Sequence, residues 1–167
     1  MCVFFTLCAC SKPSSEADIH KTSQTPPTPL LSLSELLSAD DVRDSLMQAS
    51  KLKDTEALKI WQSRLLSAAD EVNLLPSERR LIEGPQGLIF LEFQGMKFNY
   101  QLDFDKAFFN FDDVNSVFKQ YPAFESLHEQ GRVLISKRDA LIAKSAEELK
   151  KKGFKGDALS EAKLQWQ

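Results

Sequence analysis

Cysteine is absent from nearly the whole of this 167-residue chain. The sequence contains three cysteines, Cys2, Cys8 and Cys10, and all of them lie within the first ten residues. The rest of the chain therefore has neither a disulfide framework nor a thiolate metal site, and it offers no cysteine nucleophile.

The chain also has no large excess of basic or of acidic residues. The chain has 21 basic and 24 acidic residues, a net charge of −3, and the two signs are interspersed. This balance gives no basic surface for nucleic acid, so we expect no nucleic-acid partner. No run of 18 or more apolar residues follows Cys10, so we expect no membrane-spanning helix in the body of the protein.

Catalytic and metal-binding patterns are missing as well. There are two histidines, and the HExxH motif and the glycine-rich phosphate loop are absent. Residues 103–105 begin like a calcium loop, but Ala107 and Phe108 stand where an oxygen ligand and a glycine are needed. His20 lies in a polar segment, and His128 falls in an apolar seam that suits a packed ring. We therefore predict a protein that is not an enzyme and has no cofactor and no metal.

The first ten residues carry the clearest pattern in the chain. An apolar run over residues 1–5 leads into Leu7-Cys8-Ala9-Cys10 and then into polar sequence. This pattern resembles the lipobox of bacterial lipoproteins, in which an aliphatic residue and two small residues precede an invariant cysteine. The resemblance implies that Cys10 carries the lipid and becomes the N-terminus after cleavage. Residues 1–9 would then be a truncated signal segment, with the true start upstream of Met1.

The segment that follows has the composition of a tether. Residues 10–29 are rich in serine, threonine and proline and contain almost no large apolar side chains. They should stay disordered, and they would reach about 25 Å as a random coil or about 60 Å when extended. By resemblance to the enterobacterial sorting rule, Ser11 favours the outer membrane, so we expect the protein in the bacterial cell envelope, facing the periplasm. In the alternative, residues 1–9 form an apolar element packed on the body.

The body, residues 30–167, has the size of one domain, and helical patterns dominate it. A helix over about 39–50 and a second helix capped by Asp54 predict an N-terminal helical hairpin. A long C-terminal helix follows from two rows of residues at seven-residue spacing, and a last amphipathic helix spans 157–166. The two rows, which together predict one continuous apolar seam, are Leu127, Leu134 and Leu141, and His128, Ile135, Ile142 and Leu149.

Residues 85–110 fit two models. Apolar and polar residues alternate from Met96 to Phe104, which is typical of a strand, and Gln94-Gly95 could be the turn of a β-hairpin over about 88–104. The same residues fit a helix with a polar stripe that includes Gly95 and Asn99. The helical pattern covers more of the segment, so we predict an all-α helical bundle, with an α+β fold as the alternative. The apolar face of that helix is Ile89, Phe93, Met96, Tyr100, Phe104, Phe108 and Phe111.

Phenylalanine is concentrated in one part of the chain, since nine of the twelve lie between Phe90 and Phe124. Most of them are expected to form the core. The candidate surface for a hydrophobic ligand or a protein partner consists of Phe98, Phe108, Phe109 and Phe111. We expect a lipid-anchored periplasmic module that acts through a protein partner of unknown identity. The alternatives are a carrier of a small hydrophobic ligand and, third, an enzyme without a recognisable motif.

Substitution of the lipobox cysteine tests the lipoprotein resemblance. Cys10→Ala, expressed from a full-length upstream start, should release the protein from membranes and abolish fatty-acid labelling, because Cys10 is the expected acylation site. Membrane fractionation and labelling with a radioactive fatty acid measure both effects. A variant that stays labelled and membrane-bound would show that Cys10 is not the lipid attachment site.

Overall fold

The computed structural model describes residues 28–167, so Cys10, the signal segment and nearly all of the tether lie outside the described residues. Within the described part the fold is all-α, as predicted, with eight α-helices, two short 3-10 turns and no strand. The elements are α1 (Leu33–Ser38), α2 (Asp40–Leu52), α3 (Thr55–Glu71), α4 (Pro76–Arg79), η1 (Arg80–Ile82), α5 (Gly84–Asn110), α6 (Val114–Gln120), η2 (Pro122–Phe124), α7 (Glu125–Lys151) and α8 (Ala158–Trp166).

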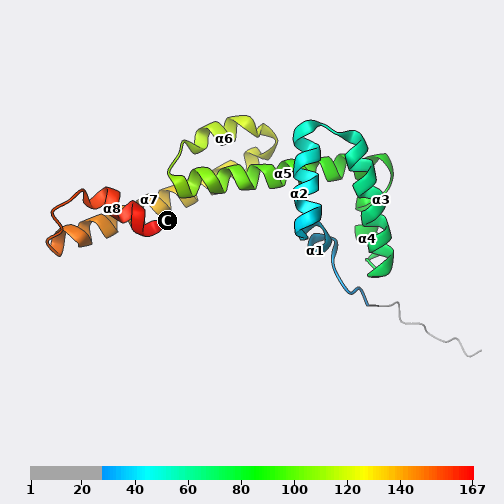
Figure 1. Ribbon diagram of the computed structural model, residues 1–167, viewed down its shortest axis with the longest axis horizontal. Helices are drawn as coiled ribbons and strands as arrows, with labels where there is room; N and C mark the ends of the chain where they lie inside the picture. Colours follow the sequence, from blue (N-terminus) through cyan, green and yellow to red (C-terminus); the bar gives the residue numbers. More distant parts are fainter. Residues whose placement is uncertain (1–27) are drawn as a thin grey trace, which may run out of the picture.

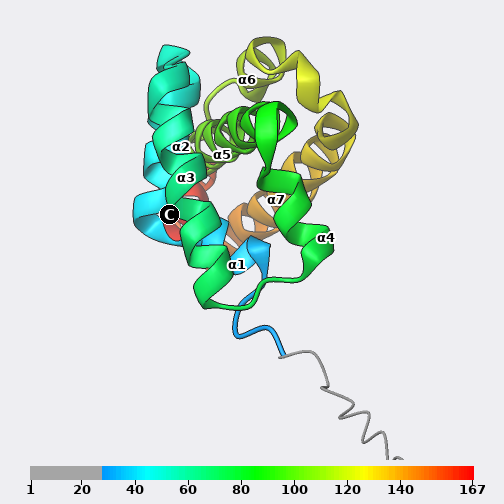
Figure 2. The same ribbon diagram turned by 90° about the vertical axis from the view of Figure 1, so that its right-hand side faces the viewer.

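Helix α5 is the axis of an elongated molecule (Figure 1). The hairpin of α2 and α3 crosses the first half of α5, whereas α6 and α7 flank the second half. Beyond the end of α5, α7 continues and pairs with α8 to form a projecting arm. Seen nearly along α5, the hairpin lies on one side of the axis, and α6 and α7 lie on the other (Figure 2).

The N-terminal hairpin forms as the sequence predicts. Lys53 adopts a left-handed conformation that ends α2, and the side chain of Asp54 accepts a hydrogen bond from the backbone N–H of Ala57, 2.9 Å away. Leu46 on α2 and Leu58 on α3 are buried between the two helices and α5. This pairing closes the first hydrophobic core of the molecule.

Residues 85–110, whose sequence fits both a helix and a β-hairpin, form one continuous helix, so the β-hairpin alternative is excluded. Helix α5 buries opposite faces in its two halves. Leu91 is fully buried in the core with α2 and α3, whereas Tyr100 is buried in the core with α6 and α7. These residues are nine positions apart, which is about two and a half turns, so their side chains leave the helix on opposite sides. The helix therefore joins two separate cores.

The predicted polar stripe on α5 was wrong at Gly95 and Asn99. Gly95 is buried where α2 crosses α5, and a β-carbon at this position would overlap the backbone carbonyl of Leu46. The amide nitrogen of Asn99 donates hydrogen bonds to the carbonyl oxygen of Met47 (2.9 Å) and to the hydroxyl of Ser50 (3.1 Å). Both residues are thus part of a close helix contact and do not form a solvated face.

The predicted apolar face of α5 is also covered along only part of its length. Ile89 is 59% exposed, because α6 and α7 do not extend over the start of the helix, and Phe93 is 39% exposed, with its ring 5.0 Å from that of Phe124. Further along, Tyr100 stacks on Phe124 with ring centroids 5.3 Å apart, and Phe104 stacks on Phe118 at 6.2 Å. Aromatic stacking of this kind fills the second core.

The long C-terminal helix is present as α7, but its predicted seam is only half buried. The row that contains His128 and Ile142 is buried, whereas Leu134 and Leu141 are 49% and 53% exposed. The reason is that α7 has α5 and α6 as neighbours near its start and α8 near its end, all on the side of the buried row. In the leucine row, Leu127 is half-buried against the second core, whereas Leu134 and Leu141 lie off the packed side of α7.

The contact at Gly95 leads to a stability prediction. Gly95→Ala should lower the free energy of unfolding by about 1–3 kcal/mol, because the added methyl group pushes α2 away from α5. Gly131→Ala is the matched comparison, since Gly131 is also buried within a helix but its β-carbon would meet ring atoms of Phe104 and Phe118 at 2.9 Å. Rings can shift more easily than backbone, so Gly131→Ala should lose less free energy of unfolding than Gly95→Ala. Urea denaturation measures the free energy of unfolding of both variants. A Gly95→Ala variant as stable as the unsubstituted protein would contradict the close contact between α2 and α5.

Candidate functional site

The predicted phenylalanine surface is divided between two places. Phe108, Phe109 and Phe111 lie together where α5 ends, with the ring centroids of Phe108 and Phe109 5.4 Å apart. Trp166 of α8 adds an edge contact to Phe108 at 6.4 Å. Phe98 lies on a different part of α5, beside the crossing with α2. The four residues therefore do not form one surface.

Arg138 of α7 organises the aromatic cluster. Its guanidinium is buried, donates a hydrogen bond to the carbonyl oxygen of Phe108, and pairs with Asp139 at 2.8 Å. The same group lies over the rings of Phe108 (4.8 Å) and Phe111 (4.6 Å). The arginine thus caps a terminal carbonyl of α5 and covers two of the three aromatic rings. Phe109, which is 50% exposed, is the cluster member most available to a partner.

Sequence reasoning missed Arg138, although a signal was present. The residue lies three positions after Ile135 and four before Ile142, so it falls on the buried row of α7. A charged residue on such a row indicates a buried partner, and here that partner is the end of α5.

Phe98 borders two surface hollows. The larger one, about 470 Å³, lies between α1, α4 and α5, and the smaller one, about 360 Å³, lies between α2 and α5. Their lining mixes apolar and polar side chains, since Gln101 borders both and Lys97 borders the larger one. Phe98 itself is half-buried against the first core. The hollows are open at the surface, which suits a polar or peptide ligand better than an enclosed apolar one.

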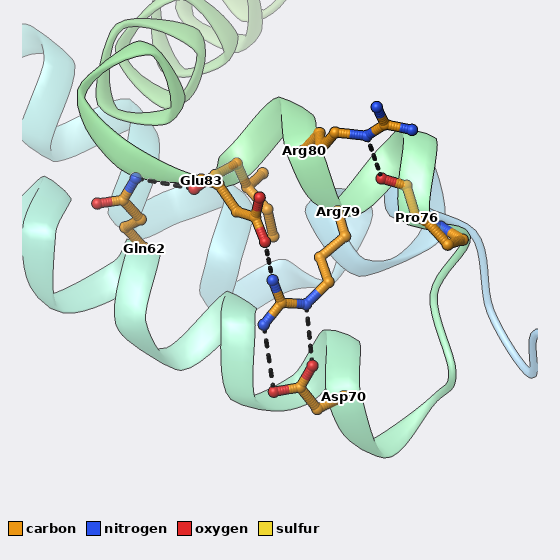
Figure 3. Close-up of polar contacts among 7 residues, drawn as sticks. Gln62, Asp70, Pro76, Arg79, Arg80 and Glu83 are labelled. Carbon is orange, nitrogen blue, oxygen red and sulfur yellow. Dashed lines mark hydrogen bonds and ion pairs between the residues drawn. The ribbon is translucent and has the colours of Figure 1, made fainter.

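A group of polar contacts that the sequence did not predict holds the turn before α5 (Figure 3). The guanidinium of Arg79 lies between the carboxylates of Asp70 and Glu83, with Nε 2.9 Å from Asp70. The amide of Gln62 donates hydrogen bonds to the carbonyl oxygens of Ile82 (2.8 Å) and Gly84 (2.7 Å). These contacts link α3 to the start of α5, so their role is structural.

Among the described residues, Tyr121 has the largest shift in pKa. Burial of the ring and its hydrogen bond to the carboxylate of Asp103, at 2.6 Å, both raise the pKa of Tyr121 far above its usual value. The phenol therefore stays protonated at neutral pH and cannot act there as a general base. Asp103 lies within helix α5, so the calcium-loop geometry is not formed at this place.

The exposed part of the leucine row consists of Leu134 and Leu141, which lie one heptad apart on α7 at the base of the arm. Val133 is also exposed but lies on a different face of the helix. The other side of the arm, formed by α8, also exposes Leu159 and Leu164. Single exposed leucines are ordinary on protein surfaces, but leucines at seven-residue spacing on one helix are typical of a surface that packs against a second helix.

Among residues 28–167, no group of three or more histidine, cysteine, aspartate or glutamate side chains is arranged to hold a metal ion. None of the helices in this part of the chain combines the length and the apolar character needed to cross a bilayer. No protein-family model matches the sequence, and comparisons with curated proteins and with solved structures gave no significant match. Function must therefore be inferred from the chemistry of the surfaces.

The buried arginine leads to a testable prediction. Arg138→Met should lower the free energy of unfolding by about 2–3 kcal/mol, because the carbonyl of Phe108 loses a charged hydrogen-bond donor. Arg64→Met is the control, since Arg64 also lies over an aromatic ring, that of Trp61, but is exposed. That variant should change stability by less than about 0.5 kcal/mol. Equal losses in the two variants, measured by urea denaturation, would rule out a special role for Arg138.

Proposed function

We propose that this protein is a lipid-anchored, non-enzymatic module of the bacterial envelope that binds another protein through its α7–α8 arm. The observation that carries this proposal is the row of Leu134 and Leu141 at the base of the arm, which is exposed although its spacing suits helix packing. Full burial of a leucine contributes about 1.5–3 kcal/mol, so a partner helix placed along the row would gain substantial binding energy.

The position of the arm supports this function. The described chain enters the domain next to α1, whereas the turn between α7 and α8 lies at the opposite end of the elongated molecule (Figure 1). With an anchor at Cys10, the arm would be held at the end of the domain far from the point of attachment. The proposed anchor itself rests on the lipobox-like residues 7–10, and the proposed periplasmic, outer-membrane location rests on that pattern and on Ser11.

A carrier of a small hydrophobic ligand is the second candidate. The hollow of about 470 Å³ beside Phe90 and Phe98 has the volume of a ligand site. Gln94, Lys97 and Gln101 also border it, however, and a hydrophobic ligand would leave these polar groups poorly solvated. The mixed lining makes this function the weaker of the two.

Site-specific photocrosslinking in whole cells tests the proposed partner surface. A photoreactive amino acid at Leu141 should give a discrete crosslinked product, because this side chain would lie in the interface. The matched control is the same probe at Ser136, which is exposed on another face of α7 and should give no such product. The double variant Leu134→Ser, Leu141→Ser, with the probe at Lys137, should lose the product with little loss of thermal stability, since both leucines are exposed. Lys137 is exposed and lies three residues after Leu134 and four before Leu141, so it is on the same face of α7 as both.

The outcomes separate the possible partners. A product with twice the mass of the chain would identify the partner as a second copy. Products that are the same at Leu141 and Ser136, or that survive the double substitution, would contradict a role for the leucine row.

A further inference from the structure

His128 is a buried polar side chain with an unmet hydrogen-bonding capacity. It is 6% exposed, its ring stacks on Phe118 with centroids 4.4 Å apart, and Tyr100 lies at 5.9 Å. These contacts pack the ring, but its Nε2 atom is buried and has no hydrogen-bond partner among the described residues. Folded proteins pair nearly all buried polar atoms, so an unpaired imidazole nitrogen beside a cavity indicates a place for a ligand atom.

Such a cavity adjoins the ring. A surface hollow of about 380 Å³ lies between α6 and the start of α7, and His128 is one of the residues that border it. The phenyl ring of Phe118 gives the hollow an apolar wall. The polar residues that border it, apart from His128, are Asn115, Lys119, Glu125 and Arg132.

The charges around the hollow favour an acceptor of hydrogen bonds. Lys119 forms no ion pair with another described residue, and it is exposed at the rim. The guanidinium of Arg132 lies 5.3 Å from the centre of the Phe118 ring, and its ion pair with Glu129 is solvent-exposed and therefore weak. Glu125 is the opposing charge at the hollow, and its exposed side chain can turn toward solvent.

We propose that this hollow binds the oxyanion group of a small molecule, a carboxylate or a phosphate. Nε2 of His128, which is closed to solvent in this structure, donates a hydrogen bond to the oxyanion after a small displacement of the side chains that cover it, and Lys119 and Arg132 supply positive charge at the rim. Histidine suits this role because its proton can reside on Nε2 while the ring remains stacked on Phe118. The site is separate from the exposed leucines, Leu134 and Leu141, which lie further along α7.

Solution NMR of the full chain tests the site. Inorganic phosphate and, separately, acetate are titrated at constant pH and ionic strength, with chloride as the balancing anion. The His128 ring signal and the backbone amide signals of Asn115 and Arg132 should shift and saturate with one of these anions, and His20 serves as the internal reference. The anion that saturates at the lower concentration identifies the class of oxyanion.

Charge variants at the rim of the hollow should change the anion affinity in opposite directions. Lys119→Gln should weaken binding about two- to fivefold, which is the range for one exposed charge, whereas Glu125→Gln should strengthen it by a similar factor. Lys155→Gln, at an exposed position beyond the end of α7, is the control and should leave the affinity unchanged. His128→Phe keeps a ring against Phe118 but removes the nitrogen, so saturation should disappear.

Two results would contradict an oxyanion site in this hollow. Shifts that grow in proportion to concentration with both anions, or an affinity that is the same in Lys119→Gln, Glu125→Gln and Lys155→Gln, would show an adventitious ion only and overturn the proposal. Because Lys119 and Glu125 are exposed, their variants keep the test valid even where His128→Phe fails to fold.

Discussion

The close contact between α2 and α5 at Gly95 is the constraint on which the rest of the arrangement depends. Without a side chain at Gly95, the carbonyl of Leu46 can lie directly against the backbone of α5. Asn99, one turn further on, donates hydrogen bonds to the carbonyl of Met47 and the hydroxyl of Ser50, so the contact buries no unpaired amide. A larger residue at Gly95 would separate the helices and open the first core.

This crossing also determines where the second core forms. Because α2 and α3 occupy one face of α5 near its start, α6 and α7 cover the opposite face near its end. The two cores are therefore displaced along the helix as well as across it, and the molecule is elongated (Figure 1). One consequence is that α7 extends past α5 with only α8 as a helical neighbour, which leaves Leu141 uncovered.

The sequence predicts the helices well because their signals are local. Steps of three and four residues over 84–110, the Asp54 cap and the heptad rows of 125–151 each depend on residues near in the chain. The change of buried face within α5 could not be predicted this way, since the same spacing is compatible with a neighbour on either side. Gly95 and Asn99 resemble solvent-exposed residues by type, and the helix that covers them is about fifty positions away in the sequence.

In the candidate site too, local sequence signals do not show which residues another helix covers. Phe108, Phe109 and Phe111 are close in the chain, so their grouping follows from helical geometry, whereas the covering of Phe108 and Phe111 by Arg138 depends on how α7 is placed. Leu134 and Leu141 have the spacing of a buried row, and nothing local distinguishes them from the row that includes Ile142. Only the absence of a covering helix in the described fold makes them a surface.

Arg138 connects this surface to the rest of the molecule. It binds the carbonyl of Phe108 where α7 leaves the end of α5, between Leu134 and Leu141 in the chain. Beyond that point the core of the arm consists of Ile142, Ala146, Ala158 and Ala162, with Phe111, Leu149 and Trp166 packed against it. The arginine, the contact of Trp166 with Phe108, and the hydrogen bond from Gln167 to the carbonyl of Phe109 hold this arm against the end of α5. A partner that binds the leucine row meets a surface whose orientation is set by the end of α5.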